Sequence, residues 1–255
     1  MQRILTAIMT LALASCTLAA QSAPPAQPAP APAPAQAPAA APATQGQDTP
    51  ATIKQKAEAG DADAQNKLGM MYALGMGVKR DYVEAGKWFR RAADQGNPDA
   101  EVKVAMMYDT GYGMPRDAKQ AAVYYSRAAE HGNVDAQLRM GSMYELGQGV
   151  PQNTATAVGY YTKAAEKNRA DAYMKLGSIF ETGHGNVPRN LRRSVECYQK
   201  AAQIGSADAE YKLGHMYEEG LGVAKNTEQA VAWYKKAAQH GSVQAKTTLV
   251  NMGRQ

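Results

Sequence analysis

The sequence contains very few cysteines and very few of the largest aromatic residues. Its 255 residues include two Cys, two Phe and two Trp. Two cysteines are too few for a scaffold held by several disulfides, or for a zinc site with four thiolate ligands. The formal net charge of +5 is too small by itself to indicate nucleic-acid binding. The apolar composition relies on Ala, Met and Tyr, which predicts small residues at close helix–helix contacts.

Long apolar runs are also missing, since no run reaches the length of about 18 residues that a membrane-spanning helix needs. The chain begins with a positive residue, Arg3, and a short apolar segment over residues 4–15. This pattern predicts a secretory signal peptide over residues 1–15. The tetrapeptide Leu-Ala-Ser-Cys, which ends at Cys16, resembles the lipobox of bacterial lipoproteins, in which the cysteine is acylated. The alternative is an ordinary signal cut near residues 20–23, which would leave the cysteine in the discarded piece.

A segment rich in Ala and Pro follows the predicted signal. Nine of the thirteen prolines lie between residues 21 and 50. Because proline lacks an N–H donor and fixes φ, this stretch cannot pair in a sheet or build a core. We predict a polyproline-II-like, disordered linker over residues 16–52 that holds a domain away from its anchor. A disordered tail without a tethering role is the alternative.

The rest of the chain consists of copies of one motif. The motif reads Ala, three variable residues, Leu-Gly, one variable residue, Met-Tyr, two variable residues and Gly-x-Gly-Val, with mild departures such as Ala105 and Met114. The copies begin at Ala64, Ala100, Ala136, Ala172 and Ala209, and a partial sixth begins at Ala245. Their spacing is 36 residues, except for one spacing of 37 that contains the additional residue Asn186. We expect this insertion to lie in a loop, where it is tolerated.

Each copy predicts two helices. When the motif is numbered from its alanine, positions 1, 5, 8 and 12 form one apolar stripe with a period of 3.6 residues. The second helix carries a pair of aromatic residues, then Ala-Ala, and ends at Gly or Asn. It begins at a residue that can cap a helix: Asp81, Asp117, Asn153, Asn190 and Asn226. Because one helix pair cannot bury both of its faces, neighbouring pairs must stack.

These residues resemble the Sel-1-like repeat (SLR) family, a relative of the tetratricopeptide repeats. The resemblance covers residues 53–255 and all five full copies. It implies an all-α fold, an α-solenoid of tandem antiparallel helix pairs in a right-handed superhelix with a concave inner face. We also expect partial capping helices at both ends. The first should start with Thr49 as its cap and Pro50 in its first turn, and the last should follow Ala245.

Motifs for catalysis or metal binding are missing from the repeats. The Gly-x-Gly loops follow no strand and lack the rest of a phosphate-binding fingerprint, so we predict helix terminators. The four histidines form no spaced ligand set, and we predict neither a metal site nor a cofactor. Cys197 replaces an aromatic residue at a packed position, where a buried thiol is expected to be inert. The sequence contains no Ser-x-x-Lys, and we predict that the protein is not an enzyme.

The variable positions of the first helix predict a binding groove. Position 4 is basic in all five copies: Lys67, Lys103, Arg139, Lys175 and Lys212. The candidate groove also contains nearby residues at positions 3 and 7: Met70, Met106, Met174, Tyr211 and His215. These positions lie opposite the packed stripe, and the resemblance places them on the concave face.

A groove with a basic column would suit an extended or helical peptide that carries carboxylates. An anionic glycan or a peptidoglycan stem peptide would fit the same chemistry. The alternative is a solvated face on which Lys and Glu pair across neighbouring helices and contribute little.

We therefore predict a non-enzymatic scaffold or adaptor that binds protein partners in a bacterial envelope. The signal and lipobox predict a periplasm-facing protein, anchored by lipid to the outer membrane of a Gram-negative bacterium. We expect no other membrane contact and no nucleic-acid partner. Two alternatives remain, a cell-wall-directed or β-lactamase-like hydrolase and a secreted effector that binds host proteins.

Overall fold

The computed structural model describes residues 49–253. The predicted signal peptide, Cys16 and nearly all of the predicted linker lie outside the described residues. Within 49–253 the chain forms α-helices and no β-strand, and none of these helices is long and apolar enough to cross a membrane. The helices are α1 (Pro50–Glu58), α2 (Ala62–Leu74), α3 (Tyr82–Asp94), α4 (Pro98–Thr110), α5 (Ala118–Glu130), α6 (Val134–Leu146), α7 (Thr154–Ala165), α8 (Ala170–Thr182), α9 (Leu191–Gln203), α10 (Ala207–Glu219), α11 (Thr227–Gln239) and α12 (Val243–Asn251).

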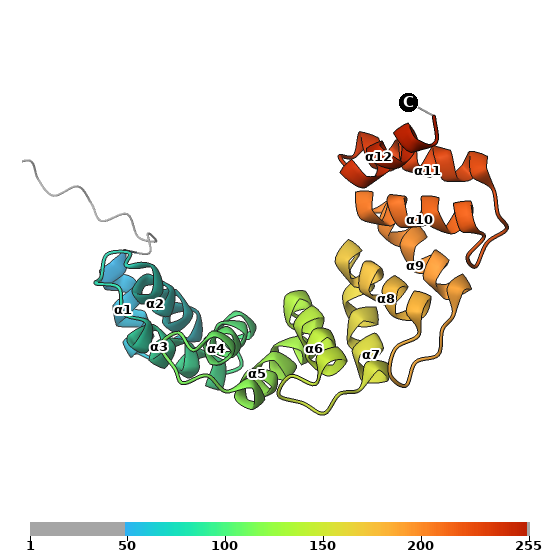
Figure 1. The fold of residues 1–255 in the computed structure, drawn as a ribbon. Helices are drawn as coiled ribbons and strands as arrows, with labels where there is room; N and C mark the ends of the chain where they lie inside the picture. The colour runs from blue at the N-terminus through green and yellow to red at the C-terminus, as the bar shows by residue number, and fades with distance from the viewer. Residues whose placement is uncertain (1–48, 254–255) are drawn as a thin grey trace, which may run out of the picture. The chain divides into compact units, whose positions relative to one another are not determined.

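The helices stack in chain order. Each helix packs mainly on the next one, from α1 on α2 to α11 on α12, and the pairs follow one another in Figure 1. Each motif copy supplies one pair, such as α2 with α3 or α8 with α9. The helices α1 and α12 are the shorter elements at the two ends of this row. The predicted all-α solenoid is thereby confirmed.

Side-chain caps set where the second helix of each pair begins. Oδ1 of Asp81 accepts hydrogen bonds from the backbone N–H groups of Val83 and Glu84, at 2.9 and 3.0 Å. The side chains of the other four predicted caps accept equivalent bonds: Asp117, Asn153, Asn190 and Asn226. At α1, Thr49 is the cap and Pro50 occupies the first turn, as predicted. These bonds satisfy N–H groups that have no partner inside the helix.

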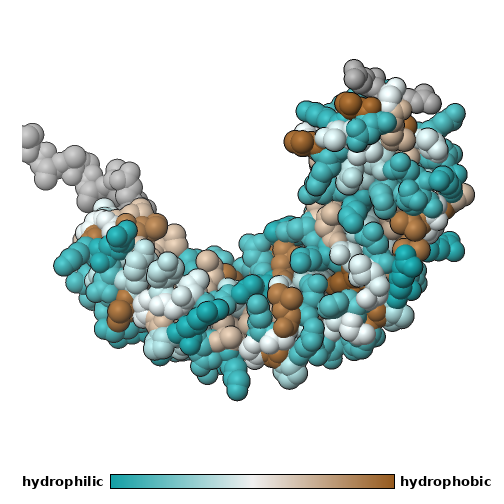
Figure 2. All heavy atoms as spheres, viewed as in Figure 1, coloured by the Kyte–Doolittle hydropathy of each residue, from teal (hydrophilic) through white to brown (hydrophobic). Residues whose placement is uncertain are grey.

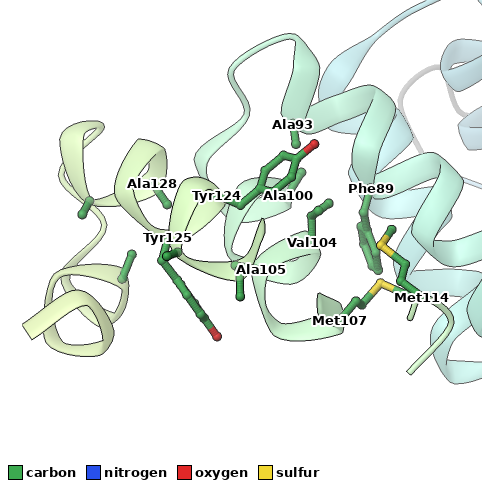
Figure 3. Close-up of a cluster of buried hydrophobic side chains, with 14 of the residues drawn as sticks. Phe89, Ala93, Ala100, Val104, Ala105, Met107, Met114, Tyr124, Tyr125 and Ala128 are labelled. Atoms are coloured by element: carbon green, nitrogen blue, oxygen red, sulfur yellow. The ribbon is translucent and has the colours of Figure 1, made fainter. Parts of the chain in front are cut away.

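A glycine in the first helix allows an aromatic ring of the second helix to approach closely. A Cβ atom added to Gly177 in α8 would lie 2.5 Å from Cε1 of Tyr198 in α9. The same close approach occurs at three other pairs: Gly69 with Phe89, Gly141 with Tyr161, and Gly214 with Tyr234. In the second copy, Ala105 takes the place of glycine, and Figure 3 shows it beside Tyr125. This contact explains why the motif couples a glycine to an aromatic residue.

The Gly-x-Gly loops connect neighbouring repeats. The first glycine ends the helix in a left-handed conformation, as at Gly111 with φ 82°. The second glycine, Gly113, also has a positive φ of 75°, and an added Cβ would clash with the backbone carbonyl of Tyr82 in the preceding repeat. The loop therefore needs glycine for two reasons, its conformation and its contact with the first residue of α3. The prediction of a helix terminator accounts for the first of these glycines only.

The additional residue Asn186 has a structural role in its loop. Its Oδ1 accepts a hydrogen bond from the backbone N–H of Ala155, at 3.0 Å. Its Nδ2 donates to Oδ1 of Asn153, the cap of α7, at 3.2 Å. The insertion lies in a loop, as expected, and adds a second cap to the helix of the preceding repeat.

Candidate binding face

The variable positions of α2, α4, α6, α8 and α10 form a surface that we call the first-helix face. The candidate residues Lys103, Arg139 and Lys212 are half-buried there, and Lys67 and Lys175 are exposed. In the view of Figure 2, hydrophilic residues cover most of the surface and apolar residues form separate patches. Two properties distinguish the parts of the first-helix face: which of its charged side chains form ion pairs, and where its apolar side chains cluster.

Three members of the basic column pair with a carboxylate from the preceding repeat. Arg139 in α6 forms an ion pair with Asp109 in α4. The other two pairs are Lys175 with Glu145 and Lys212 with Glu181, with Nζ–Oε2 distances of 3.8 and 3.2 Å. Each acid stands at motif position 10, and each base stands at position 4 of the next copy. The structure thus contains the pairing across neighbouring helices that was one of the two alternatives.

The paired carboxylates also accept a hydrogen bond from a buried tyrosine. The hydroxyl of Tyr161 donates to Oε2 of Glu145, and that of Tyr198 donates to Oε2 of Glu181, both at 2.7 Å. Burial raises the pKa of both tyrosines, and the carboxylate that accepts the bond raises it further. Each of the two tyrosines therefore stays protonated and donates this hydrogen bond. Each carboxylate contacts a tyrosine of the next helix and a base of the helix after that, and so connects three helices.

The same arrangement is incomplete in the last copy. The hydroxyl of Tyr234 donates to Oε2 of Glu218 at 2.6 Å. Burial, with this carboxylate, again raises the tyrosine pKa. Thr248 in α12 stands at the position where the other copies have a base. Within the described residues, Glu218 therefore forms no ion pair.

The arrangement is also incomplete at Lys103. The first copy has Ala73 at position 10, so no carboxylate faces Lys103 from α2. Within residues 49–253 its Nζ forms no ion pair; it lies 3.4 Å from the carbonyl oxygen of Asp99 and 5.9 Å from the centre of the Phe89 ring. Lys103 is thus a cation whose nearest acceptor is a backbone oxygen of its own helix.

Lys103 lines an apolar cleft of about 340 Å³ between α2, α3 and α4, which we call the Lys103 pocket. Phe89 and Met107 are buried there, and Figure 3 shows both side chains in the same cluster as Met114. Apart from the half-buried Ala73, the rest of its apolar lining is exposed, from 39% for Met70 to 65% for Tyr112. These exposed members are Met70, Leu74, Tyr82, Met106 and Tyr112. The predicted groove residues Met70, Met106 and Lys103 are thereby brought together in one cleft.

A second cleft, of about 580 Å³, lies on the same face between α6 and α8 and extends to the start of α10. Leu138, Met174 and Lys175 line it together with polar side chains such as Ser142 and Ser178. Two of the predicted groove residues, Met174 and Lys175, meet in this cleft. It is more polar than the Lys103 pocket because serines replace the position-7 methionines of the first two copies, and because Asp171, Ser206 and Asp208 also line it.

The remaining candidate residues belong to neither cleft. Tyr211 packs with its ring centre 5.4 Å from that of Tyr234, and His215 is exposed on α10. Lys67 lines a smaller cleft of about 240 Å³ near the start of α2, together with Asp61 and Asp63. Among the described residues, the candidate groove residues thus fall into several local sites.

Sequence reasoning missed several residues of the Lys103 pocket, above all Leu74, Tyr82, Phe89 and Tyr112. The sequence signal for this pocket is found when the same motif position is compared across the five copies. The first copy lacks the acid of position 10 and has Ala73 instead, and the middle residues of the first two Gly-x-Gly loops are Met and Tyr. The next two loops have Gln148 and His184 there, and the last loop has Leu221.

Two histidines contact buried carboxylates away from this face. Nδ1 of His131 lies 2.9 Å from Oε2 of Glu101, and Nδ1 of His240 lies 2.8 Å from Oε2 of Glu210. Both glutamates are almost fully buried. Across residues 49–253, no cluster of three His, Cys, Asp or Glu side chains could hold a metal ion. Burial raises the pKa of Cys197 to about 11, so its thiol is protonated at neutral pH.

The arrangement defines a class of protein, a helical repeat array whose frame is constant and whose surface positions vary. A family model described as "Sel1 repeat" matches residues 62–97, 98–133, 134–168, 170–206 and 207–242. The chain belongs to the Sel1 repeat family. Members of this family are generally non-catalytic scaffolds that mediate protein–protein interaction.

Solved structures support this assignment. A protective antigen of uropathogenic Escherichia coli strains, which displays an SLR fold, is 37% identical with a TM-score of 0.75. The match covers 81% of this chain and 44% of that one, so this chain corresponds to less than half of the antigen. A Sel1 repeat protein from Oxalobacter formigenes is 32% identical over 79% of this chain and 88% of its own, with a TM-score of 0.63. No curated protein matches the sequence.

Proposed function

We propose that this protein is a non-enzymatic scaffold of a bacterial envelope that binds protein partners along the first-helix face. One observation carries the proposal. The two clefts at Lys103 and at Met174 both lie on this face, and the lining of both includes positions that vary between copies, such as motif positions 3 and 7. The packing positions, in contrast, repeat in every copy. A frame that is held constant while one face changes is suited to the recognition of a particular partner.

The chemistry of this face favours a peptide over an anionic glycan. Arg139, Lys175 and Lys212 are already paired with carboxylates, so an anionic partner would have to compete with those acids. Both clefts contain methionine, a flexible and polarisable side chain that adapts to different apolar groups. A protein segment with apolar side chains and few acidic ones would use both features.

The envelope location is part of the proposal and rests on the N-terminal sequence. The signal pattern and the lipobox ending at Cys16 lead us to propose lipid anchoring to the outer membrane, facing the periplasm. The description of the 37% identical Escherichia coli protein as a protective antigen is consistent with an exported protein. Labelling cells with an alkynyl fatty acid should mark the wild type and leave Cys16→Ser unmarked. Equal labelling of both would contradict the anchor.

The binding function can be tested with partners captured from envelope extracts by the purified chain. Met106→Glu and Met174→Glu each place a carboxylate in one cleft. Val123→Glu on α5 is a matched control, because this residue is 45% exposed and lines neither cleft. We expect at least one cleft variant to lose partners that the control retains. If all three variants capture the same partners as the wild type, the first-helix face is not the binding surface.

The same preparations separate the two alternatives. Turnover of a chromogenic β-lactam by the wild type, above that of a buffer blank, would favour a hydrolase. Release of the full-length mature chain into the culture medium without acylation would favour a secreted effector. Our proposal predicts no turnover and retention in the envelope.

A further inference from the structure

The Lys103 pocket lies at a boundary where the base–acid pattern of the repeats is interrupted by the loss of the acid. The next three boundaries each join a base to an acid of the preceding copy, as Lys212 is joined to Glu181. At the boundary between the first two copies, Ala73 replaces the acid and Lys103 is left without a carboxylate partner among the described residues. The frame thus leaves room for a carboxylate at a position where the other boundaries supply one.

The side chains around this space are apolar, in contrast to the side chains at the same place in the later copies. Position 7 is Met70 and Met106 in the first two copies and serine in the next two. The rings of Tyr82 and Tyr112 lie with their centres 5.8 Å apart at the edge of the pocket. The corresponding helix start in the next copy is Ala118. Exposed apolar side chains gathered around one cation are typical of a recognition site.

We propose that the Lys103 pocket binds a segment of a partner protein that carries an apolar side chain next to a carboxylate. The apolar group would lie against Phe89 and Met107, and the carboxylate would take the place that Glu181 takes beside Lys212. The pocket volume of about 340 Å³ suits one or two side chains. This inference rests on the proposed function, because it names the chemistry of the partner at one site of the same face.

A substitution within the protein can compete with the carboxylate of such a segment for Lys103. Ala73→Glu supplies the missing acid from within the protein, at a position that accepts Glu in three other copies. We expect the new carboxylate to pair with Lys103 and to block the site. Ala73→Gln is the matched control, since it adds nearly the same volume without a charge. Lys103→Met removes the cation and retains an unbranched side chain of similar length.

The probe is a random dodecapeptide library displayed on phage and selected on the full purified chain. Selected peptides, labelled with fluorescein, are then titrated by fluorescence anisotropy. We expect them to contain Asp or Glu beside a large apolar residue. We expect Ala73→Glu to weaken their binding by about tenfold or more, and Ala73→Gln to weaken it much less. Exchanging the acid of the peptide for its amide should weaken binding to the wild type but not to Lys103→Met.

Several results would overturn the inference. Selected peptides that contain no acidic residue would show that Lys103 does not bind a carboxylate of the partner. Peptides that bind the wild type and Ala73→Glu equally would show the same. Peptides lost only in Met174→Glu would leave the proposed function standing and place binding in the other cleft. A library that yields no binder for the wild type would count against both. Dimerisation, or binding to phosphatidylglycerol vesicles, that Ala73→Glu abolishes would assign the pocket to a second copy or to lipid.

Discussion

Two glycines in neighbouring helices should respond to the same substitution in opposite ways. Gly159 in α7 and Gly177 in α8 both lie inside a helix. A Cβ atom at Gly159 would meet nothing within 4 Å, whereas a Cβ atom at Gly177 would lie 2.5 Å from the ring of Tyr198. Alanine therefore adds only helix propensity at the first site, and a steric conflict as well at the second.

The expected magnitudes follow from these two environments. Replacing glycine by alanine inside a helix gains about 0.5–1 kcal/mol of folding free energy. At Gly177 the added methyl overpacks a filled contact, which costs about 1–3 kcal/mol. The ring cannot easily retreat, because Tyr198 is fully buried and its hydroxyl is bonded to Glu181. We expect Gly177→Ala to be less stable than Gly159→Ala by about 2 kcal/mol.

Urea-induced unfolding, followed by circular dichroism at 222 nm, measures this difference. Gly159→Ala should raise the unfolding midpoint, and Gly177→Ala should lower it. For a domain of this size, about 2 kcal/mol corresponds to a difference in Tm of about 4–8 °C. If Gly177→Ala proves as stable as Gly159→Ala, the close approach of ring and backbone does not hold the helix pair together.

Three further predictions concern other parts of the frame. Tyr198→Phe should cost about 1–2 kcal/mol in the same unfolding assay, because the half-buried carboxylate of Glu181 loses a hydrogen-bond donor. Tyr160→Phe should change little, because the Tyr160 hydroxyl has no hydrogen-bond partner in the described part of the chain. Asn186→Ala should cost about 1 kcal/mol through the lost cap of α7, and an unchanged midpoint would show that the insertion is merely tolerated. In a Cys16→Ser background, Cys197 should react slowly with iodoacetamide at pH 8 and faster only as the pH approaches its raised pKa of about 11. The urea-unfolded chain should react readily near pH 9, and equal rates for the folded and unfolded chains would show that the thiol is not shielded.

The fold could be predicted almost completely because the information is local and recurs in each copy. Caps such as Asp81 and helix-ending glycines such as Gly111 each determine the conformation of a few neighbouring residues. Five copies of the same signals leave little room for another assignment of the helices. The second role of Gly113, its contact with the carbonyl of Tyr82, could not be predicted, because it joins residues of two different repeats.

The binding face was less predictable because its character depends on side chains that are distant in sequence. The basic column is visible in the sequence, but its neutralisation depends on acids about one repeat earlier, such as Glu181 for Lys212. The direction of each side chain on its helix decides whether such a pair forms. The Lys103 pocket depends equally on Ala73, whose importance lies in the carboxylate that it lacks.

The central claim is that partners bind on the first-helix face, and site-specific photo-crosslinking in living cells tests it most directly. A benzophenone amino acid is placed at Met106 in the Lys103 pocket, or at the exposed control position Val123 on α5. We predict discrete crosslinked adducts from Met106 on irradiation, and none of the same size from Val123. Adducts from Val123 alone, or the same adducts from both positions, would contradict the claim.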